Sequence, residues 1–240
     1  MSFIESVAKL LTLNAIVIYK EKLNEHVFHL KIRGEDLSDL NYISGQHLRI
    51  LVGLGKSTAF KDKVRTYSVW NYDKDNQTID IAVCTHSNGI GSKWITDLKI
   101  GEKIYFSKPK GNFVIDNSAD FYIFVGDISA LAHLYEIRRN LTAEKKVYSL
   151  IYSDKTEDFF EDLDKSVKFD FKKLPENSSD DIIKEITAFA TISKGKGIVY
   201  LGGDGRVCVT LNKHFKKIFN WDTKQIKTKP FWHPDKIGLE

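Results

Sequence analysis

The stretch "KVRTYSVW" (residues 63–70) combines residue types that can hold a phosphorylated aromatic ligand. Its composition is typical of a strand, on which side chains alternate between faces, so Arg65 and Tyr67 point one way and Thr66 and Ser68 the other. A guanidinium beside an aromatic ring can bind a phosphate and a flat ring together. The same residues could also form an ordinary cation–aromatic pair on a solvated sheet face, and taken alone this simpler interpretation is preferred.

A second candidate is "THSNGIGSKW" (residues 85–94), a flexible turn before a short helix. Gly89 and Gly91 free the backbone, and the helix is expected to open at Ser92, which would serve as its N-cap. The first N–H groups of a helix and its dipole both favour an anion, so this turn is a candidate phosphate cradle. A plain capped loop is at least as common, and a lone histidine such as His86 is more often a hydrogen-bonded strand residue than a ligand.

Two further candidates are the Gly-Asp pairs in "FVGDISA" (124–130) and "LGGDG" (201–205), each at the end of an apolar run. Ligands of parallel α/β sheets bind outside the carboxyl ends of the strands, where such residues replace apolar ones. Gly-Asp also simply ends strands and caps helices. The G-x-G-x-x-G fingerprint of dinucleotide sites is absent.

Other chemistries find no support in the sequence. The cysteine and histidine spacings do not suit zinc, and neither a G-x-S-x-G elbow nor a P-loop occurs. No metal site is therefore predicted. The acids Glu157, Asp158, Glu161 and Asp162 are interpreted as a solvated face.

The elements that must position these residues change character near the middle of the chain. From residue 14 to about 113, short β-rich runs alternate with turn signals at the spacing of antiparallel hairpins. The runs are "AIVIYKEK", "HVFHLKIRG", "QHLRILVG", "RTYSVWNYD" and "TIDIAVCTH". They predict a closed or nearly closed antiparallel barrel.

From about residue 119 the pattern becomes an alternation of strands and helices. The predicted strands are "DFYIFVG", "KVYSLIYSD", "VKFDFKKL" and "KGIVYLGGD", and the predicted helices are "DISALAHLYEIRRNL", "SDDIIKEITAFATI" and "VCVTLNKHFKKIF". Asp127 or Ser129 could cap the first helix. The alternation predicts a parallel sheet covered on both faces. We therefore expect two domains, residues 1–115 as the barrel and residues 116–240 as the α/β domain.

Composition bounds the class of protein. The 240 residues are 42% hydrophobic and carry a formal charge of +4, with lysines scattered among almost as many acids, so no nucleic-acid partner is expected. Cys84 and Cys208 lie in apolar runs and are expected to be buried free thiols, which indicates a reducing compartment. No stretch is long enough to cross a bilayer, and a cytoplasmic location is expected.

The order of these motifs resembles the ferredoxin–NADP reductase superfamily, and within it the siderophore-interacting proteins, which are flavin-dependent ferric-siderophore reductases. The resemblance runs from about residue 14 to the C-terminus. Seven segments carry it in the family's order: "SGQHLRILV", "RTYSVW", "HSNGIGSKW", "KPKGNF", "VGDISALAHL", "LGGDGRV…LNKHF" and "KPFWHPDKIG". Each segment is weak alone, but the shared order is specific.

The resemblance implies an FAD site in the first domain. Arg65 would pair with a flavin phosphate, Tyr67 would lie against the isoalloxazine ring, and Ser68 would bond near its reactive N5, so Tyr67 and Ser68 are the catalytic candidates. The remaining implied FAD contacts are Thr85, His86, Gly89, Gly91, Ser92, Trp94 and, on the C-terminal tail, Trp232. A surface anchor is an equally good interpretation of Trp232.

The resemblance also implies a site for NADH or NADPH between the two domains. Its implied contacts are Gly126, Asp127, Ser129, Gly203 and Asp204. Lysines near the flavin would attract an anionic ferric chelate, and the candidates are Lys56, Lys61, Lys63 and Lys110. Loop lysines are more often simply solvated.

We therefore expect an NAD(P)H oxidoreductase that reduces Fe(III) in a siderophore or another chelate through FAD and releases Fe(II). The alternatives are a flavin reductase or electron-transfer subunit of the same superfamily, and a siderophore-binding or iron-trafficking module without enzymatic activity. The resemblance does not separate NADH, NADPH and ferredoxin as the electron donor.

Overall fold

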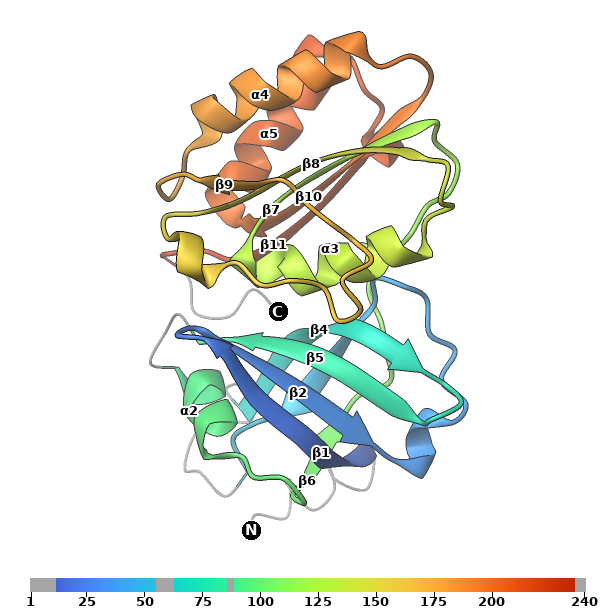
Figure 1. The fold of residues 1–240 in the computed structure, drawn as a ribbon, viewed down its shortest axis with the longest axis vertical. Helices are drawn as coiled ribbons and strands as arrows, with labels where there is room; N and C mark the ends of the chain where they lie inside the picture. The colour runs from blue at the N-terminus through green and yellow to red at the C-terminus, as the bar shows by residue number, and fades with distance from the viewer. Residues whose placement is uncertain (1–11, 55–62, 86–88, 236–240) are drawn as a thin grey trace. The chain divides into compact units, whose positions relative to one another are not determined.

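A computed structural model describes residues 12–54, 63–85 and 89–235. The chain divides into two compact units, and the division falls between Asn112 and Phe113. The first unit is an antiparallel barrel and the second is a parallel sheet with helices, as labelled in Figure 1. This confirms the fold class expected from the sequence.

Six strands form the closed barrel in the order β1-β2-β5-β4-β3-β6. They are β1 (Leu13–Asn24), β2 (Val27–Arg33), β3 (His47–Leu51), β4 (Val64–Asp73), β5 (Thr78–Cys84) and β6 (Lys103–Phe106). Every neighbouring pair is antiparallel, and β6 closes the barrel by pairing with both β1 and β3. Closure leaves no unpaired sheet edge for another chain to extend.

Alternation along these strands fills the barrel. On β5, Ile79, Ile81 and Val83 enter the core, and each is fully buried. The short helix η1 (Glu35–Leu37) adds Leu37 to the same core. Helix α2 (Ile90–Asp97) packs on it through Ile95, so the position of α2 is fixed by the barrel.

The second unit contains a five-stranded parallel sheet in the order β11-β10-β7-β8-β9. Its strands are β7 (Phe121–Asp127), β8 (Lys146–Ser153), β9 (Phe171–Lys173), β10 (Gly197–Asp204) and β11 (Ile226–Trp232). The helices are α3 (Ile128–Asn140), α4 (Ser179–Ile192) and α5 (Gly205–Ile218), with short turns η3 (Thr156–Asp158) and η4 (Thr223–Gln225).

Helix α3 covers one face of the sheet, and α4 and α5 cover the other (Figure 1). Both faces of the sheet are therefore shielded from solvent. This explains why β7 and β10 are buried at every residue and why their sequences are continuous apolar runs. The sheet order reverses between β7 and β10. In sheets of this class the crevice at that reversal, beside the carboxyl ends of the strands, is where ligands bind.

Several local predictions were wrong. Strands β6 and β11 were not predicted, because the lysines and Pro230 in or beside them obscure the strand pattern and only pairing with distant strands defines them. Strand β9 is limited to three residues of the predicted "VKFDFKKL" run. Asp158 and Asp162 are buried rather than solvated, and they bond to Ser153 and Arg139. Cys208 is buried but Cys84 is only half-buried; both are free thiols.

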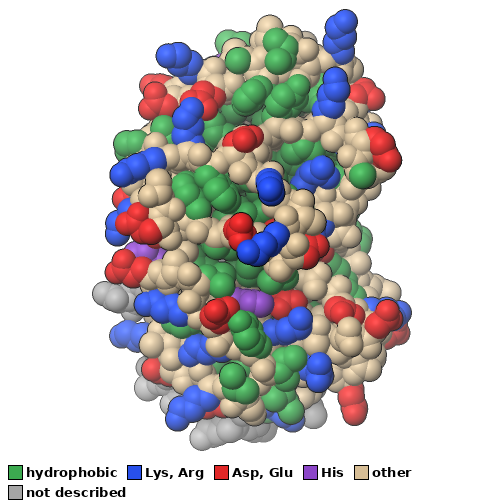
Figure 2. Space-filling model, viewed as in Figure 1, with side chains coloured by type: hydrophobic (Ala, Val, Ile, Leu, Met, Phe, Trp, Pro, Cys, Tyr) green, Lys and Arg blue, Asp and Glu red, His purple; other side chains and the backbone are tan. Residues whose placement is uncertain are grey.

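On the face shown in Figure 2, basic and acidic side chains are interspersed rather than segregated by sign. Within the described part of the chain, no helix combines the length and the apolar character needed to span a membrane.

Candidate functional site

The Arg65–Tyr67 pair lies on the face of β4 that continues into the barrel core. Strands β3 and β4 pair so that Arg65 is opposite Ile50 and Tyr67 is opposite Leu48, and directly opposite residues share a face. Ile50 and Leu48 are fully buried, whereas Arg65 and Tyr67 are half-buried. Both functional candidates are therefore anchored on a rigid strand at the border of the core.

Helix α2 places its first turn directly against these two side chains. A Cβ atom on Gly91 would lie 2.6 Å from the Tyr67 hydroxyl and 3.4 Å from Cγ of Arg65. Only a residue without a side chain allows this approach, which gives Gly91 a packing reason to be glycine. The first turn of α2 is thus held next to β4. A single site that binds both a phosphate and a flat ring requires this proximity.

The start of α2 differs from the prediction. The helix begins at Ile90 with Gly89 as an extended N-cap, so Ser92 lies inside the first turn and is not the cap. Ile90 and Trp94 pack against the barrel core, and this packing draws the preceding residues into the helix. The first turn contains no acidic residue and the cap makes no side-chain hydrogen bond. Its N–H groups and dipole therefore favour an anion.

Two aromatic rings stand together beside this turn. The rings of Tyr67 and Trp94 are stacked, with centroids 5.8 Å apart and planes inclined by 25°. The Arg65 Nη1 donates a hydrogen bond of 2.6 Å to the carbonyl of Val64, which holds the guanidinium near its own strand. A fixed cation, a supported aromatic ring and an anion-favouring helix turn thus lie within one small region.

The opposite face of the same strands carries Ser68 and two residues that the sequence did not single out. Ser68 is buried and lies directly opposite His47, while Arg49 follows two residues along β3 on that face. The Arg49 Nε is buried without a hydrogen-bond partner. A Cβ on Gly111 would lie 2.7 Å from His47 Nδ1, so the imidazole packs on bare backbone. Only the strand register reveals this grouping.

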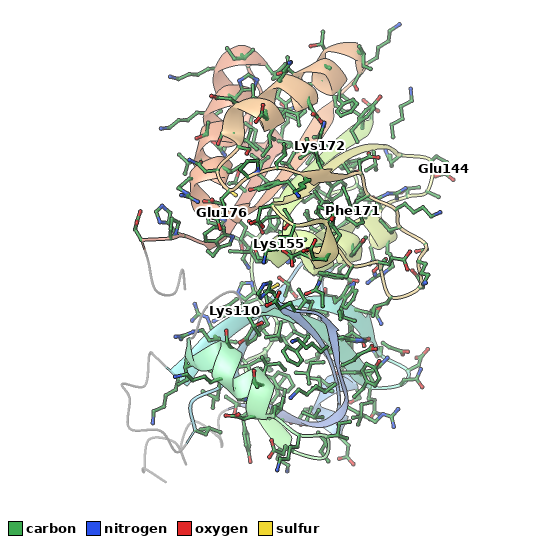
Figure 3. The ribbon with its side chains drawn as sticks, turned by 60° about the vertical axis from the view of Figure 1, so that its left-hand side comes forward. Lys110, Glu144, Lys155, Phe171, Lys172 and Glu176 are labelled. Atoms are coloured by element: carbon green, nitrogen blue, oxygen red, sulfur yellow. The ribbon has the colours of Figure 1, made fainter. Side chains whose placement is uncertain are left out.

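The other first-unit candidates have mixed outcomes. Thr85 already makes two hydrogen bonds within the barrel, because its N–H and its hydroxyl donate to the carbonyl of His26 at 2.7 and 3.1 Å. Lys63 is only 7% exposed and its carbonyl accepts from Val52, so it is not the exposed loop lysine that chelate docking needs. Lys110 is exposed and its backbone pairs with His47 (Figure 3). Candidates outside the described residues are Lys56, Lys61 and His86.

In the second unit, Asp127 gathers four hydrogen bonds at the carboxyl end of β7. Its Oδ1 accepts from the Ser129 N–H at 2.9 Å and the Ser129 hydroxyl at 2.5 Å, so Asp127 caps α3. Its Oδ2 accepts from the Asp204 N–H at 2.7 Å and from Trp232 Nε1 at 2.8 Å. One buried carboxylate therefore joins the ends of β7, β10 and β11.

The glycines at the carboxyl ends of β7 and β10 are required by packing and backbone conformation. Gly126 and Gly202 are register partners, and a Cβ on either would meet Ala130 of α3 within 3.2 Å, so they let the helix approach the sheet. Gly203 has φ +105°, and any side chain there would collide with the Asp127 carboxylate. Contacts of Gly126 and Gly203 with a nucleotide remain a prediction.

Asp204 and Trp232 are both tied to Arg206. Asp204 caps α5 by accepting from the Arg206 N–H at 2.8 Å, and it holds the guanidinium through bonds of 2.6 to 3.1 Å. That guanidinium lies over the Trp232 indole, 5.7 Å from its centroid. Trp232 is thus fixed within the second unit by Asp127 and Arg206, and its role toward the flavin stays a prediction.

Tyr152 is a buried group at this edge that sequence reasoning missed. It pairs with Asp127 in the register of β7 and β8, and its hydroxyl is buried with no hydrogen-bond partner. Burial, and then the negative charge of Asp127, raises the pKa of this hydroxyl, so it stays protonated as a donor. Burial likewise raises the pKa of the Cys208 thiol. An unsatisfied donor at the carboxyl end of a parallel sheet makes Tyr152 a candidate contact for a ligand.

Among residues 12–54, 63–85 and 89–235, no group of three or more His, Cys, Asp or Glu side chains is arranged to hold a metal ion.

The barrel, the parallel sheet and these two sites define a two-domain protein of the ferredoxin reductase-like class. Residues 14–115 match the family model of the oxidoreductase FAD-binding domain, and residues 119–235 match that of the siderophore-interacting proteins. The first unit thus carries an oxidoreductase FAD-binding domain, and the second a siderophore-interacting domain.

Several curated relatives carry reductase names. The chain is 29% identical over 118 residues to NADH-cytochrome b5 reductase 1 of Cryptococcus neoformans, covering 48% of this chain and 39% of that protein. It is 24% identical to the ferric vibriobactin reductase ViuB of Vibrio cholerae, covering 59% and 58%. It is 22% identical to the NADPH-dependent ferric-chelate reductase of Escherichia coli, covering 68% and 63%. The matches thus span about two fifths to just under two thirds of these relatives' lengths.

Solved structures share the fold over nearly the whole chain. The siderophore-interacting protein SipS from Aeromonas hydrophila superposes with a TM-score of 0.77 at 17% identity, covering 94% of this chain and 93% of that one. An H286L mutant of ferredoxin-NADP+ reductase from Plasmodium falciparum gives 0.72 at 18% identity, covering 91% and 96%. At these identities the likeness concerns the fold alone.

Proposed function

We propose that this protein is an FAD-dependent reductase of ferric chelates, in which NADH or NADPH supplies electrons and Fe(III) in a siderophore is the final acceptor. The observation that carries the proposal is the contact of the Arg65–Tyr67 face of β4 with the first turn of α2 at Gly91. The siderophore-interacting domain in the second unit supports the choice of substrate.

The residues of the first unit fit FAD. The planar guanidinium of Arg65 suits the geometry of a phosphate, which it can bind through two parallel hydrogen bonds. The first turn of α2, with Gly89, Gly91 and Ser92, offers N–H donors and a favourable dipole to the pyrophosphate. Tyr67, backed by Trp94, would provide the aromatic surface for the flavin ring, and Ser68 with its neighbour His47 would line the polar edge. The buried, unpartnered Nε of Arg49 is a donor that an anionic group could satisfy.

Arg65, Tyr67 and the first turn of α2 would hold FAD, and the chemistry that FAD would supply is to pass the electron pair of a pyridine nucleotide to ferric iron one electron at a time. The work of the chain is to place and orient the reactants and to keep water away. Ser68, which is buried, would direct a hydroxyl at the reacting edge of the ring, and His47 beside it could hold a proton there. Ferrous iron is held less well than ferric iron by the hard oxygen ligands of siderophores, so reduction releases the metal.

The nucleotide would use the carboxyl edge of the second sheet, at the reversal between β7 and β10. Asp127, Ser129 and Asp204 shape this edge, and the Tyr152 hydroxyl is available to donate to the ligand. Of the four candidate lysines, Lys110 is the one that is both described by the structure and exposed, and we propose that it attracts an anionic chelate. The free thiols Cys84 and Cys208 fit a reducing compartment, and we place the protein in the cytoplasm.

The test begins with an absorbance spectrum of the purified protein and anaerobic titration with NADH and with NADPH. The proposal predicts bound FAD, bleaching by at least one nucleotide, and formation of Fe(II) from a ferric siderophore, detected with a colorimetric Fe(II) chelator. Release of the flavin with turnover of added free flavin would instead identify a flavin reductase. If the bound flavin is bleached by reduced ferredoxin but by neither nucleotide, the electron donor is ferredoxin rather than NADH or NADPH. Protein without any affinity for FAD would overturn the proposal.

An Arg65→Ala variant tests the phosphate contact. Loss of a charge-assisted bond to phosphate costs about 1.5–3 kcal/mol, so FAD should bind about 10- to 150-fold more weakly. The matched control is Arg33→Ala, which removes an exposed arginine from β2 of the same barrel. Equal FAD retention by the two variants would contradict the role of Arg65.

A further inference from the structure

The ends of α4 and α5 expose two large apolar side chains. Ile192, the last residue of α4, is 69% exposed, and Ile218, the last residue of α5, is 65% exposed. No other exposed large hydrophobic residue in the described part of the chain reaches these values. Thr187 of α4 is hydrogen-bonded to His214 of α5, and about one further turn along each helix leads to the two isoleucines. Both therefore lie at the same end of the second unit.

This end is the amino side of the sheet. A helix that connects parallel strands runs opposite to them, so α4 and α5 end beside the starts of β10 and β11 (Figure 1). Figure 2 shows this end only from the side, at its top, where hydrophobic side chains are exposed next to basic ones. The nucleotide edge proposed above lies at the carboxyl side. A partner bound at the amino side would leave that edge uncovered.

Basic residues surround the two isoleucines. Segments 192–196 and 213–224 contain six lysines and one acid, whereas the formal charge of the whole 240-residue chain is only +4. All six lysines are exposed: Lys194, Lys196, Lys213, Lys216, Lys217 and Lys224. The positive charge of the chain is thus concentrated at this end of the second unit.

The nearest acids bind backbone groups rather than these lysine side chains. Asp222 caps η4 and accepts from the Lys224 N–H at 2.7 Å. Asp120, which precedes β7, accepts from the Lys196 N–H at 2.7 Å. Among the described residues, no carboxylate forms an ion pair with any of the six lysines. Their charges are therefore available to an anionic partner.

The helix dipole alone does not account for this pattern. Lysines in the last turn of a helix interact favourably with its dipole, which explains Lys216 and Lys217. It does not explain Lys194, Lys196 and Lys224, which lie outside α4 and α5, or the exposure of the two isoleucines. Exposed apolar side chains among basic residues are the combination that binds the surface of anionic membranes.

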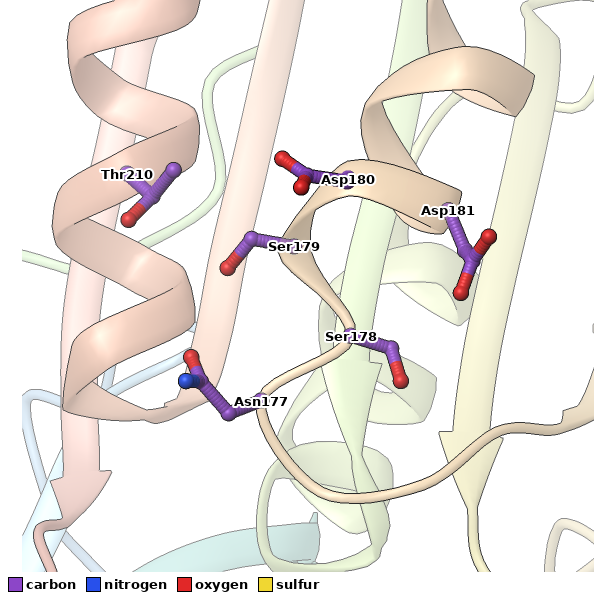
Figure 4. Close-up of a pocket in the computed structure, with 6 residues that line it drawn as sticks. All are labelled: Asn177, Ser178, Ser179, Asp180, Asp181 and Thr210. Atoms are coloured by element: carbon purple, nitrogen blue, oxygen red, sulfur yellow. The ribbon is translucent and has the colours of Figure 1, made fainter.

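The opposite end of α4 is acidic. The helix begins with Asp180 and Asp181, which Figure 4 shows in its first turn, and Glu176 precedes them. An anionic surface would attract one end of this unit and repel the other, so the direction of approach is defined. A contact of this kind needs no membrane-spanning helix.

We infer that the ends of α4 and α5 bind the surface of a bilayer that contains anionic phospholipids. The six lysines contact the headgroups, and Ile192 and Ile218 reach the boundary between headgroups and acyl chains. The half-buried Trp221 lies in the same segment, and tryptophan is enriched at this boundary. Nucleic acid fits less well, because aliphatic side chains neither stack on bases as aromatic rings do nor hydrogen-bond to them. The inference does not depend on the proposed function.

Co-sedimentation of the full-length protein with lipid vesicles tests the inference. Vesicles of equimolar phosphatidylcholine and phosphatidylglycerol should retain the protein at about 0.1 M salt, and vesicles of phosphatidylcholine alone should not. Salt of about 1 M should release most of the protein, because it screens the lysines. The assay involves no electron transfer, so its result is separate from the proposed function.

Two double variants separate the contributions of charge and apolar contact. Lys216→Gln/Lys217→Gln should bind the anionic vesicles about 10- to 30-fold more weakly than the wild type. Ile192→Ser/Ile218→Ser should bind them about tenfold more weakly, because less apolar surface leaves water. Thermal melting of each variant separates lost binding from lost folding.

The matched controls alter exposed residues of the barrel unit. Lys99→Gln/Lys103→Gln removes the same amount of charge, and Ile43→Ser/Ile100→Ser removes two isoleucines that are 50% and 62% exposed. Both control variants should bind the anionic vesicles as the wild type does.

Several outcomes would overturn the inference. These are equal binding to the two kinds of vesicle, wild-type binding by both variants of α4 and α5, and equal losses in the barrel controls. An effect of the lysine variant without any effect of the isoleucine variant would reduce the contact to general charge attraction, and the inference would fail. Displacement from the vesicles by a double-stranded DNA oligomer that binds more tightly would identify nucleic acid as the partner instead. None of these results bears on the reduction of ferric chelates.

Discussion

Replacing Gly91 by alanine should separate the stability of the barrel from its capacity to bind FAD. The new Cβ would lie 2.6 Å from the Tyr67 hydroxyl, and ordinary contact begins near 3.4 Å, so the hydroxyl must move by about 0.8 Å. Gly91 sits in an α-helix, where alanine is favoured over glycine by up to about 1 kcal/mol. The gain in helix propensity offsets the local strain, and the free energy of unfolding should change by no more than about 1 kcal/mol.

The affinity for FAD should respond to Gly91→Ala far more strongly than the free energy of unfolding does. Stacking of a planar ring on an aromatic side chain contributes about 1–3 kcal/mol, and the shift of Tyr67 removes the surface on which the ring would lie. FAD should therefore bind about 5- to 150-fold more weakly to Gly91→Ala. The assay is a fluorescence titration of apoprotein with FAD, accompanied by urea unfolding.

A second substitution makes the test specific. Tyr67→Phe removes the hydroxyl with which the Cβ collides, so the double variant Gly91→Ala/Tyr67→Phe should recover most of the FAD affinity of Tyr67→Phe alone. Asp97→Ala, at the far end of α2, is the control for a substitution within the same helix. Wild-type affinity in Gly91→Ala, or no recovery in the double variant, would refute the reasoning.

Three further predictions follow from buried groups. Asp127→Asn should lower the free energy of unfolding by about 2–4 kcal/mol in urea and shift the fluorescence of Trp232, because the amide cannot accept all the donors around it. Burial alone would raise the pKa of Asp80, but the hydrogen bond from His29 and the charges of His29 and Lys31 outweigh it and lower the pKa. The stability this contributes is full above the ordinary aspartate pKa and is lost as the pH falls through the lower folded value. His29→Gln should therefore flatten the rise of the unfolding free energy with pH in this acid range. Cys208, whose pKa is raised by burial, should resist a thiol reagent until the protein unfolds.

Each of these has a control and a contrary outcome. Asp235→Asn removes an exposed carboxylate near Trp232 and should leave stability unchanged; an equal loss there would argue against a special role for Asp127. His26→Gln, on a half-buried histidine of the same barrel, should keep the wild-type pH profile, and a profile unaffected by His29→Gln would show that the pairing with Asp80 does not lower its pKa in solution. Cys84 is half-buried and should react first; labelling of Cys208 at the same rate would disprove its burial.

The sequence determined the kind of fold because its signals are local. Alternation at Ile79, Ile81 and Val83 depends only on the two-residue period of a strand, and the unbroken apolar runs of β7 and β10 report burial on both faces. The proximity of Arg65 to Tyr67 follows from the same period. Together with the order of the motifs, this was enough to predict a barrel, a parallel sheet and the two domain families whose models match them.

Other features depend on partners that are distant along the chain, and only the tertiary structure decided them. The start of α2 is set by packing of Ile90 and Trp94 on the barrel rather than by the serine that a local rule favours. Asp127 is a junction because Trp232, 105 residues later, donates to it. The hydroxyl of Tyr152 became a candidate ligand contact because the fold buries it without a hydrogen-bond partner, and no local sequence pattern indicates a missing partner.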